Sequence, residues 1–422
     1  MATTRAIPRL FAVLIAVGYT VLALVSWRLN PPQEFGDTYR YFGSTLFDIQ
    51  NPGITPVFLY TTLVDPWRVT LVQTLLSVAV WLFFAWALSR RITHPFLRSF
   101  LPIVALLVSL TPALWSWNTF LSSESVSFSA MVLWLAVIVQ VTRPTVGPWI
   151  TTLLVVLSGA FLIVTRPAVA VVVLPVSVLI AWWQWRSTQA RIPALLTVLL
   201  TGGATIYGIL RLLLLSGDPT YRYRYAINNY VDKTSSFRAH ADANMPPCEP
   251  LVAAVNGPAP WDEVWVLKEQ LMSVCTESYL WLQSGKTSAA SWVLAVPFDA
   301  ITNFIGSMSA VTLFGYGPGR AIPDAVSGVL LPSGDWWLVM LVSIALGIIV
   351  ALIARVRPTS WAYLIMSVAV ISVSITGYAF AIWAADGIEL ARHLLPVTAL
   401  LPIAVVVLPT AFLSRNSGAQ HS

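Results

Sequence analysis

The segment "GDTYRYF", residues 36–42, places a carboxylate, a guanidinium and two phenols directly after the first apolar run of the chain. Its reactive members are Asp37, Tyr39, Arg40 and Tyr41. A carboxylate walled by aromatic rings at a membrane surface suits a general base that takes a proton from a hydroxyl group. The same aspartate suits the N-cap of a helix beginning at Thr38, and residue physics alone favours the cap.

The elements that hold this segment are those of a membrane protein. The chain has 422 residues, of which 57% are hydrophobic and 10% are charged, and its mean hydropathy is +0.76. Soluble domains are far less apolar. Apolar runs near the length that crosses a bilayer recur along the chain, and they are continuous rather than alternating. We therefore predict an all-α polytopic membrane protein.

Ten spanning helices are expected, at about residues 10–27, 69–88, 100–116, 124–141, 149–165, 168–185, 193–214, 336–354, 359–379 and 394–413. Two long polar segments, 28–68 and 216–335, interrupt the pattern. They divide the chain into a membrane module (1–215) that contains the first loop, a large second loop (216–335), and C-terminal membrane helices with a tail (336–422). In the second loop we expect a short helix at 261–283 and then interfacial or re-entrant helices. Two further spans there are the alternative.

The charges separate into two sets under this topology. The basic residues of the termini and short connections fall on one side: Arg5, Arg9, Arg90, Arg91, Arg98, Arg143, Arg186, Arg191, Arg355, Arg357 and Arg415. All 18 acidic residues fall on the other side. The positive-inside rule makes the basic side cytoplasmic. We expect a plasma-membrane protein with both termini in the cytoplasm and its reactive face outside.

Four stretches, in this order, resemble motifs of the GT-C glycosyltransferases, integral membrane enzymes that use sugars carried on polyprenyl phosphate. They are Gly36-Asp37 followed by Pro52-Gly53 and Pro56, then Ser123-Glu124, then Arg166-Pro167, and finally Arg392-His393 with Pro396. The resemblance covers most of residues 8–215 and 385–413 and points to the branch of aminoarabinose transferases and protein mannosyltransferases. It implies a GT-C-like helical bundle.

The resemblance also implies an activity, which is the inverting transfer of a hexose or pentose from a polyprenyl-phosphate donor to an envelope glycan, glycolipid or protein. Asp37 would be the base. Arg166, Arg392 and Arg40 would bind the departing phosphate, because the planar guanidinium fork matches phosphate oxygens. Further candidates for substrate contact are Tyr39, Tyr41, Glu124, Arg222, Arg224 and His393.

Several of these candidates have structural alternatives. Glu124 begins a helix, where the helix dipole alone favours an acid. Arg222 and Arg224 alternate with tyrosines, as residues that contact lipid headgroups also do. His393 equally suits a packing role. Arg211, near the outer end of the seventh helix, could extend its side chain to the membrane surface.

The sequence supports no cofactor. Relatives often pair acids around a divalent metal, but the candidate base here stands alone, so a metal is possible and unsupported. We find no cluster suited to zinc and no Walker glycine loop. The scattered cytoplasmic arginines give no support to nucleic-acid binding. Cys248 and Cys275 both lie in the second outer loop, which favours one disulfide over two free thiols.

Three other functions compete with sugar transfer: a flippase or transporter of lipid-linked saccharides, a polymerase of glycan repeats, and a structural scaffold. Transporters carry ionisable residues in the middle of their helices. The expected spans are nearly free of charge, and the polar residues gather at one face, which favours chemistry there. The polymerase is not separable on sequence. Sugar transfer requires Asp37, Arg166 and Arg392 to converge.

Overall fold

The structure, a computed structural model, describes residues 6–34, 38, 54–91, 95–141, 146–232, 241, 245–258, 260–284, 289–310, 374–380 and 382–383. Across these ranges the regular secondary structure is helical, apart from two strands of two residues each. The predicted all-α class is confirmed.

Six helices in the described part of the chain are long and apolar enough to cross a membrane. They belong to α1 (Ala6–Leu29), α4 (Pro66–Arg91), α7 (Ser123–Val141), α8 (Pro148–Thr165), α9 (Ala170–Thr188) and α10 (Arg191–Gly217). The chain is therefore a multi-pass membrane protein, as predicted. The helices expected at 336–354 and 394–413 lie outside the described residues, and of the one at 359–379 only 374–379 is described, as helix.

The helix expected at 100–116 was wrong at its C-terminal end. The structure has α5 (Pro95–Ser109), a single turn α6 (Pro112–Trp115) and the 3-10 turn η2 (Ser116–Asn118). The Thr111 hydroxyl donates to the Val108 carbonyl over 2.7 Å. Pro112 has no backbone N–H and disfavours a helical conformation for the residue before it, so α5 cannot continue through this point. The apolar stretch Arg98–Ser109 is shorter than a span.

The chain forms two compact units. One comprises Met1–Ile209, Thr312–Ile375 and Leu395–Ser422, and the other comprises Leu210–Val311 and Thr376–Leu394. The chain passes from the first unit to the second between Ile209 and Leu210, within α10 (Arg191–Gly217).

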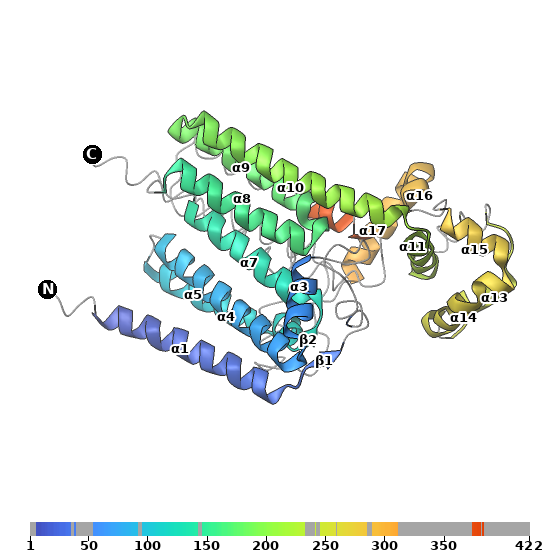
Figure 1. Ribbon diagram of the computed structural model, residues 1–422, viewed down its shortest axis with the longest axis horizontal. Coiled ribbons are helices and arrows are strands. Elements are labelled where there is room, and N and C mark those ends of the chain that lie inside the picture. The colour runs from blue at the N-terminus through green and yellow to red at the C-terminus, as the bar shows by residue number, and fades with distance from the viewer. Residues whose placement is uncertain are drawn as a thin grey trace. The chain divides into compact units, whose positions relative to one another are not determined.

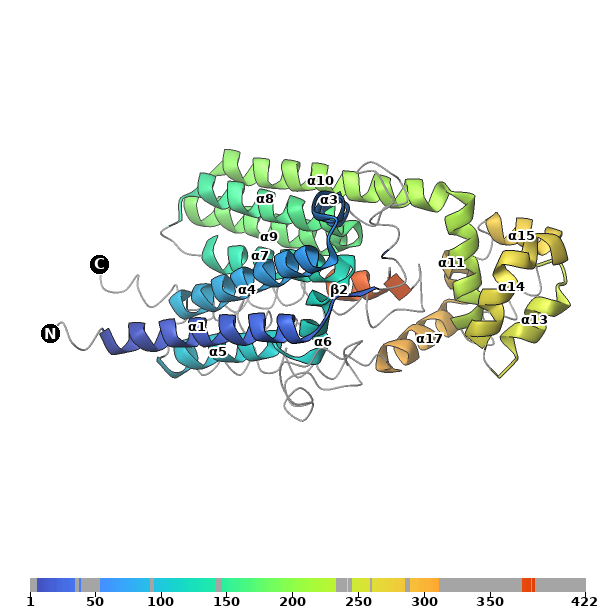
Figure 2. The same ribbon diagram turned by 60° about the horizontal axis from the view of Figure 1, so that its bottom comes forward.

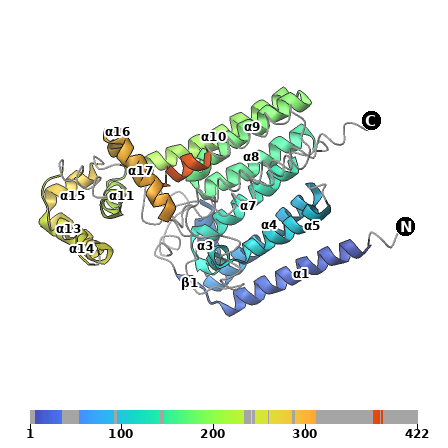
Figure 3. The same ribbon diagram turned by 180° about the vertical axis from the view of Figure 1, so that it is seen from behind.

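In the first unit α7 is the central helix. It packs against α4 on one side and α8 on the other, and α4 in turn contacts α1 and α5 (Figures 1 and 3). Eighteen of its residues are buried, which explains why α7 has apolar residues all round. By contrast α1 is an edge helix with exposed apolar side chains such as Phe11, Leu14 and Val17. In a membrane protein, exposed apolar side chains of this kind contact the lipid tails.

Short elements gather at the end of the bundle where α1 finishes and α4 and α7 begin (Figure 1). β1 (Gln33–Glu34) follows α1, and β2 (Phe120–Leu121) precedes α7. The two strands pair in parallel, with Gln33 opposite Phe120 and Glu34 opposite Leu121. The helix α3 (Ile54–Leu63) packs on α4, α7 and α8. We call this end of the first unit the strand end.

The second unit is built from short helices, described here by themselves (Figure 2): α11 (Pro219–Asp232), α13 (Glu249–Val255), α14 (Pro260–Val274), α15 (Thr276–Gln283), α16 (Ala289–Ala295) and α17 (Pro297–Ala310). The single helix expected at 261–283 is interrupted at Cys275, which has an extended φ of −138°. The helices α16 and α17, with 7 and 14 residues, are too short to span a bilayer. No spanning helix occurs within 289–310.

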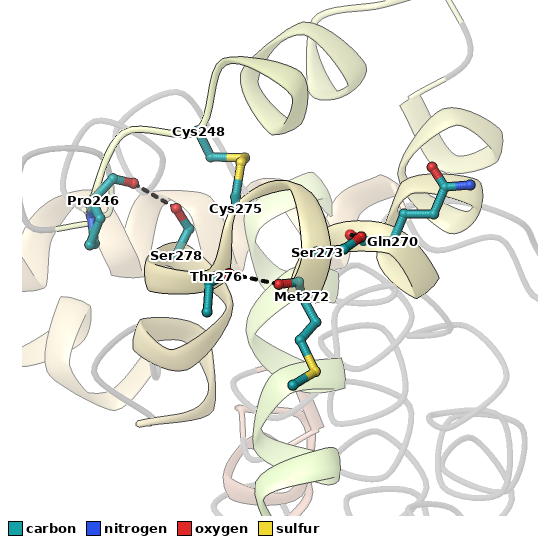
Figure 4. The surroundings of a disulfide bond; sticks show 8 residues. All are labelled: Pro246, Cys248, Gln270, Met272, Ser273, Cys275, Thr276 and Ser278. Atoms are coloured by element: carbon teal, nitrogen blue, oxygen red, sulfur yellow. Dashed lines mark hydrogen bonds between the residues drawn. A yellow bond between two sulfur atoms is a disulfide. The ribbon is translucent and has the colours of Figure 1, made fainter.

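Cys248 and Cys275, the two cysteines expected to pair, are joined by a disulfide (Figure 4). They occupy the positions directly before α13 and α15. Beside the bridge, the Ser278 hydroxyl donates to the Pro246 carbonyl over 2.9 Å. The bridge and this hydrogen bond hold α15 against the segment that leads into α13.

Candidate functional site

Arg166 lies at the strand end, where α8 stops. Its backbone is extended, with φ −143° and ψ 92°, and its N–H donates to the Leu162 carbonyl as the last bond of the helix. Pro167 follows and begins a 3-10 turn, Pro167–Val169, that leads into α9. A residue before proline is disfavoured in helix, so the Arg-Pro pair produces the corner at which this side chain sits. Arg166 is buried.

Glu124 occupies the first turn of α7 and faces Arg166. Its Oε1 lies 3.6 Å from Nη1 of Arg166, with side chains only 3% and 10% exposed respectively. The Ser123 hydroxyl lies 3.5 Å from the other carboxylate oxygen. An ionised side chain is costly to bury unless it is paired, so each charge stabilises the other in this place. The structure thus brings together two residues that sequence motifs marked separately.

The segment that leads to Glu124 is irregular and buried. Every residue of 114–132 is buried. The turn contains Asn118, whose Oδ1 accepts a 2.7 Å hydrogen bond from the Ser125 hydroxyl. Irregular backbone at membrane depth persists only where protein groups satisfy its polar atoms. We call residues 118–124 the corner segment.

The first loop is bonded to the corner segment on both sides of "FGD", residues 35–37. Before it, the Gln33 N–H donates to the Thr119 carbonyl over 2.9 Å, next to the β1–β2 pairing. After it, the buried Thr38 hydroxyl donates to the Leu121 carbonyl over 2.7 Å. Thr38 directly follows Asp37 in the sequence. The loop that carries the candidate base and the segment that carries Glu124 are therefore attached to each other.

Two further side chains meet the corner segment from α3 and α4. The Tyr60 hydroxyl donates to the Ser122 carbonyl over 3.0 Å, and Nε2 of Gln73 approaches the same carbonyl at 3.3 Å. Gln73 also donates to the Tyr60 oxygen over 2.9 Å. Sequence reasoning missed both residues. A glutamine inside an apolar helix is a signal that could have marked Gln73.

Six of the sequence-predicted residues lie outside the described part of the chain. They are Asp37, Tyr39, Arg40, Tyr41, Arg392 and His393. The expected convergence of Asp37, Arg166 and Arg392 therefore stays a prediction. Within the described ranges, no group of three or more His, Cys, Asp or Glu side chains is arranged to hold a metal.

The remaining candidates belong to the second unit. Arg222, on α11, donates from Nη2 to the Gly217 carbonyl over 3.1 Å. Beside it, the rings of Tyr223 and Tyr279 lie 4.7 Å apart. Burial raises the pKa of the Tyr223 phenol, and the neighbouring Tyr279 raises it further, so Tyr223 stays a neutral hydrogen-bonding group. Arg224 is part of α11. Arg211 on α10, whose side chain is long enough to extend to the membrane surface, is buried.

Comparison with known proteins found similarity to a solved structure and no match by sequence. No family model matches the sequence, and no curated protein matches it. Among solved structures, the chain is similar to the crystal structure of ArnT from Cupriavidus metallidurans bound to undecaprenyl phosphate. The similarity covers 99% of this chain and 79% of that one, with 15% sequence identity and a TM-score of 0.36. A likeness at that level leaves activity to be argued from the residues of this chain.

Proposed function

We propose that the protein is an inverting glycosyltransferase of the GT-C type. It moves one sugar from a polyprenyl-phosphate donor to a glycan, glycolipid or protein of the cell envelope, on the extracytoplasmic face. The observation that carries this proposal is the buried Glu124–Arg166 pair, because Glu124 belongs to the corner segment to which the first loop is hydrogen-bonded. A buried guanidinium beside the loop that bears the candidate base Asp37 suits phosphate release coupled to proton removal.

In the proposed reaction Asp37 accepts the proton of the acceptor hydroxyl. The hydroxyl oxygen forms a bond to the anomeric carbon as the bond from that carbon to the phosphate oxygen breaks. The bonding electrons leave with the lipid phosphate, which gains negative charge. Arg166, with Arg392 and Arg40, stabilises that charge, which is an effect that grows in a site with little water. Attack opposite the leaving phosphate inverts the anomeric centre.

Charge placement supports the proposed side of the membrane. In the first unit the strand end carries both signs, whereas the ends of α4, α9 and α10 that face away from it carry basic residues. At the strand end lie Glu34, Asp65, Glu124, Arg28, Arg68 and Arg166, and at the opposite ends lie Arg90, Arg186 and Arg191. Under the positive-inside rule the strand end is extracytoplasmic. A plasma-membrane donor lipid would then present its phosphate at the level of the corner segment.

The experiment uses the full chain purified and reconstituted with polyprenyl-phosphate-linked hexoses and pentoses. Sugar transfer to envelope glycans, glycolipids and proteins is followed by mass spectrometry. We expect Asp37→Asn to abolish transfer. The matched control is Asp65→Asn, which changes another acid of the strand end at a helix cap where asparagine serves equally well.

Three outcomes would overturn the proposal. Full transfer by the Asp37→Asn variant would remove the assigned base. Substrate-coupled flux across liposomes without a covalent product would show a flippase instead, and joining of complete glycan repeats would show a polymerase.

A further inference from the structure

The Ser122 carbonyl is held by a closed triangle of hydrogen bonds. Tyr60 donates to it from α3 over 3.0 Å, Gln73 approaches it from α4 at 3.3 Å, and Gln73 donates to Tyr60 over 2.9 Å. All three residues are completely buried. Water therefore cannot replace a lost member, and the triangle holds three separate elements together at one backbone atom.

The chemistry of the triangle needs an amide at position 73. The Gln73 amide nitrogen donates to the Tyr60 oxygen over 2.9 Å and lies within 3.3 Å of the Ser122 carbonyl oxygen. A carboxylate of the same shape has no proton to donate and would face two oxygen atoms. A thioether of similar volume fills the space and donates nothing. The site therefore distinguishes glutamine from its nearest isosteres.

Ser122 lies between the two attachments that define the candidate site. One residue before it, Leu121 accepts the hydrogen bond of Thr38 and pairs with Glu34. Two residues after it, Glu124 contacts Arg166. Because the backbone between these points is short, a shift of the Ser122 carbonyl displaces both the loop attachment and the ion pair.

We propose that Tyr60 and Gln73 are positioning residues of the transferase site. They fix the corner segment, and through it they set the position of Arg166 relative to the loop that carries Asp37. This inference rests on the proposed function. A displacement on the order of 1 Å is enough to slow a reaction greatly without removing any reacting group.

The test compares Tyr60→Phe, Gln73→Met and the double variant with wild type, all as full-length protein. The control is Thr74→Val, at the neighbouring position of α4. Thr74 is also completely buried, and its hydroxyl has no hydrogen-bond partner among the described residues. Two readouts are used: hydrogen–deuterium exchange of peptides covering 118–124, and kcat and KM of sugar transfer at temperatures well below unfolding.

We expect each single variant to speed exchange in the corner segment and to lower kcat by about tenfold, with little change in KM for the donor. A purely structural role would lower the unfolding temperature and leave kcat per folded molecule unchanged. The double variant should lower kcat by less than the product of the two single effects, because the two side chains belong to one hydrogen-bond network. Thr74→Val should match wild type in both readouts.

The outcomes separate the two proposals. Unchanged exchange in 118–124 for Gln73→Met would show that the triangle of hydrogen bonds does not hold the corner segment, whatever the effect of the variant on sugar transfer. Faster exchange with unchanged kcat would overturn the positioning role. If the wild type transfers no sugar, the proposed function fails and the positioning role fails with it, while the exchange data still decide whether the triangle holds the corner segment.

Discussion

The guanidinium of Arg166 lies 3.6 Å from the carboxylate of Glu124, and both residues are buried at the strand end of the first unit. One side chain comes from the residue that directly follows α8 and the other from the first turn of α7. Each charge is therefore held by a helix end and neutralised by its partner. A buried charge at such a place is a functional candidate by default in a membrane protein.

Removing one member of this pair should be costly. We expect Arg166→Met to lower the free energy of unfolding by about 3–5 kcal/mol, because it leaves the Glu124 carboxylate buried without its counter-charge. Adding Glu124→Met should restore part of the loss, since an apolar pair of similar volume is tolerated. Denaturant unfolding in detergent measures both effects.

The exposed pair Asp65–Arg68 serves as the control for that experiment. Its atoms lie 3.5 Å apart, but the side chain of Arg68 is 73% exposed. Arg68→Met should change stability by less than about 1 kcal/mol. Equal losses for the two arginine variants would contradict the importance given to burial.

The hydroxyl of Thr38 is expected to matter for activity as well as stability. Thr38→Val leaves the buried Leu121 carbonyl without this donor, which should cost about 1–3 kcal/mol. Sugar transfer should fall with it, and Thr38→Ser should retain both properties. As a control, Thr61→Val removes a hydroxyl whose bonds to described residues all lie within its own helix α3, and it should leave transfer unchanged. Wild-type turnover in Thr38→Val would argue against the attachment.

Val64 offers a stabilising substitution. It follows α3 with a φ of 57°, a left-handed conformation that is rare for a β-branched residue, and its side chain is 66% exposed. Its N–H donates to the Tyr60 carbonyl, as the residue after a helix end does. Val64→Gly relieves the strain and should raise the free energy of unfolding by about 1 kcal/mol.

A second position extends this prediction. Gln189, after α9, has a φ of 52°, and Gln189→Gly should stabilise by a smaller amount because glutamine is not β-branched. Glycine in the middle of a helix is destabilising, so Val17→Gly in α1 is the opposite control. Thermal unfolding of the three variants gives the comparison, and a lower midpoint for Val64→Gly would contradict the strained turn.

The disulfide should contribute strongly to the second unit. Cys248 and Cys275 are separated by 27 positions. Closing a loop of this length should stabilise the folded state by about 3–4 kcal/mol through the entropy of the unfolded chain. Replacing both cysteines by serine should lower the midpoint of thermal unfolding, and a reductant should lower that of the wild type alone. A midpoint of the double variant equal to that of oxidised wild type would refute this.

The positions of several membrane helices can be predicted from the sequence. The apolar runs at 124–141 and 149–165 correspond closely to α7 and α8, because a membrane helix is defined by composition and length. The helix expected at 100–116 failed after Ser109, because Pro112 interrupts it. Hydropathy sums over a window and does not register such a local break.

The site shows a different balance. Motifs marked Glu124 and Arg166 but did not show that they touch. Nothing in the sequence pattern distinguished Tyr60 from the other aromatic residues of the first loop. Its role becomes apparent only from the hydrogen bond that its hydroxyl donates to the Ser122 carbonyl. Thr38 was considered as part of a helix start, and its bond to Leu121 was not foreseen.

The sequence by itself determined that this is a helical membrane protein and where the long helices of its first half lie, because these depend on the solvation of each segment taken alone. Only the tertiary structure decided that Glu124 meets Arg166 and that α3 and α4 grip the Ser122 carbonyl. Contacts between distant helices depend on how their surfaces fit together. A pattern read along one segment does not contain that information.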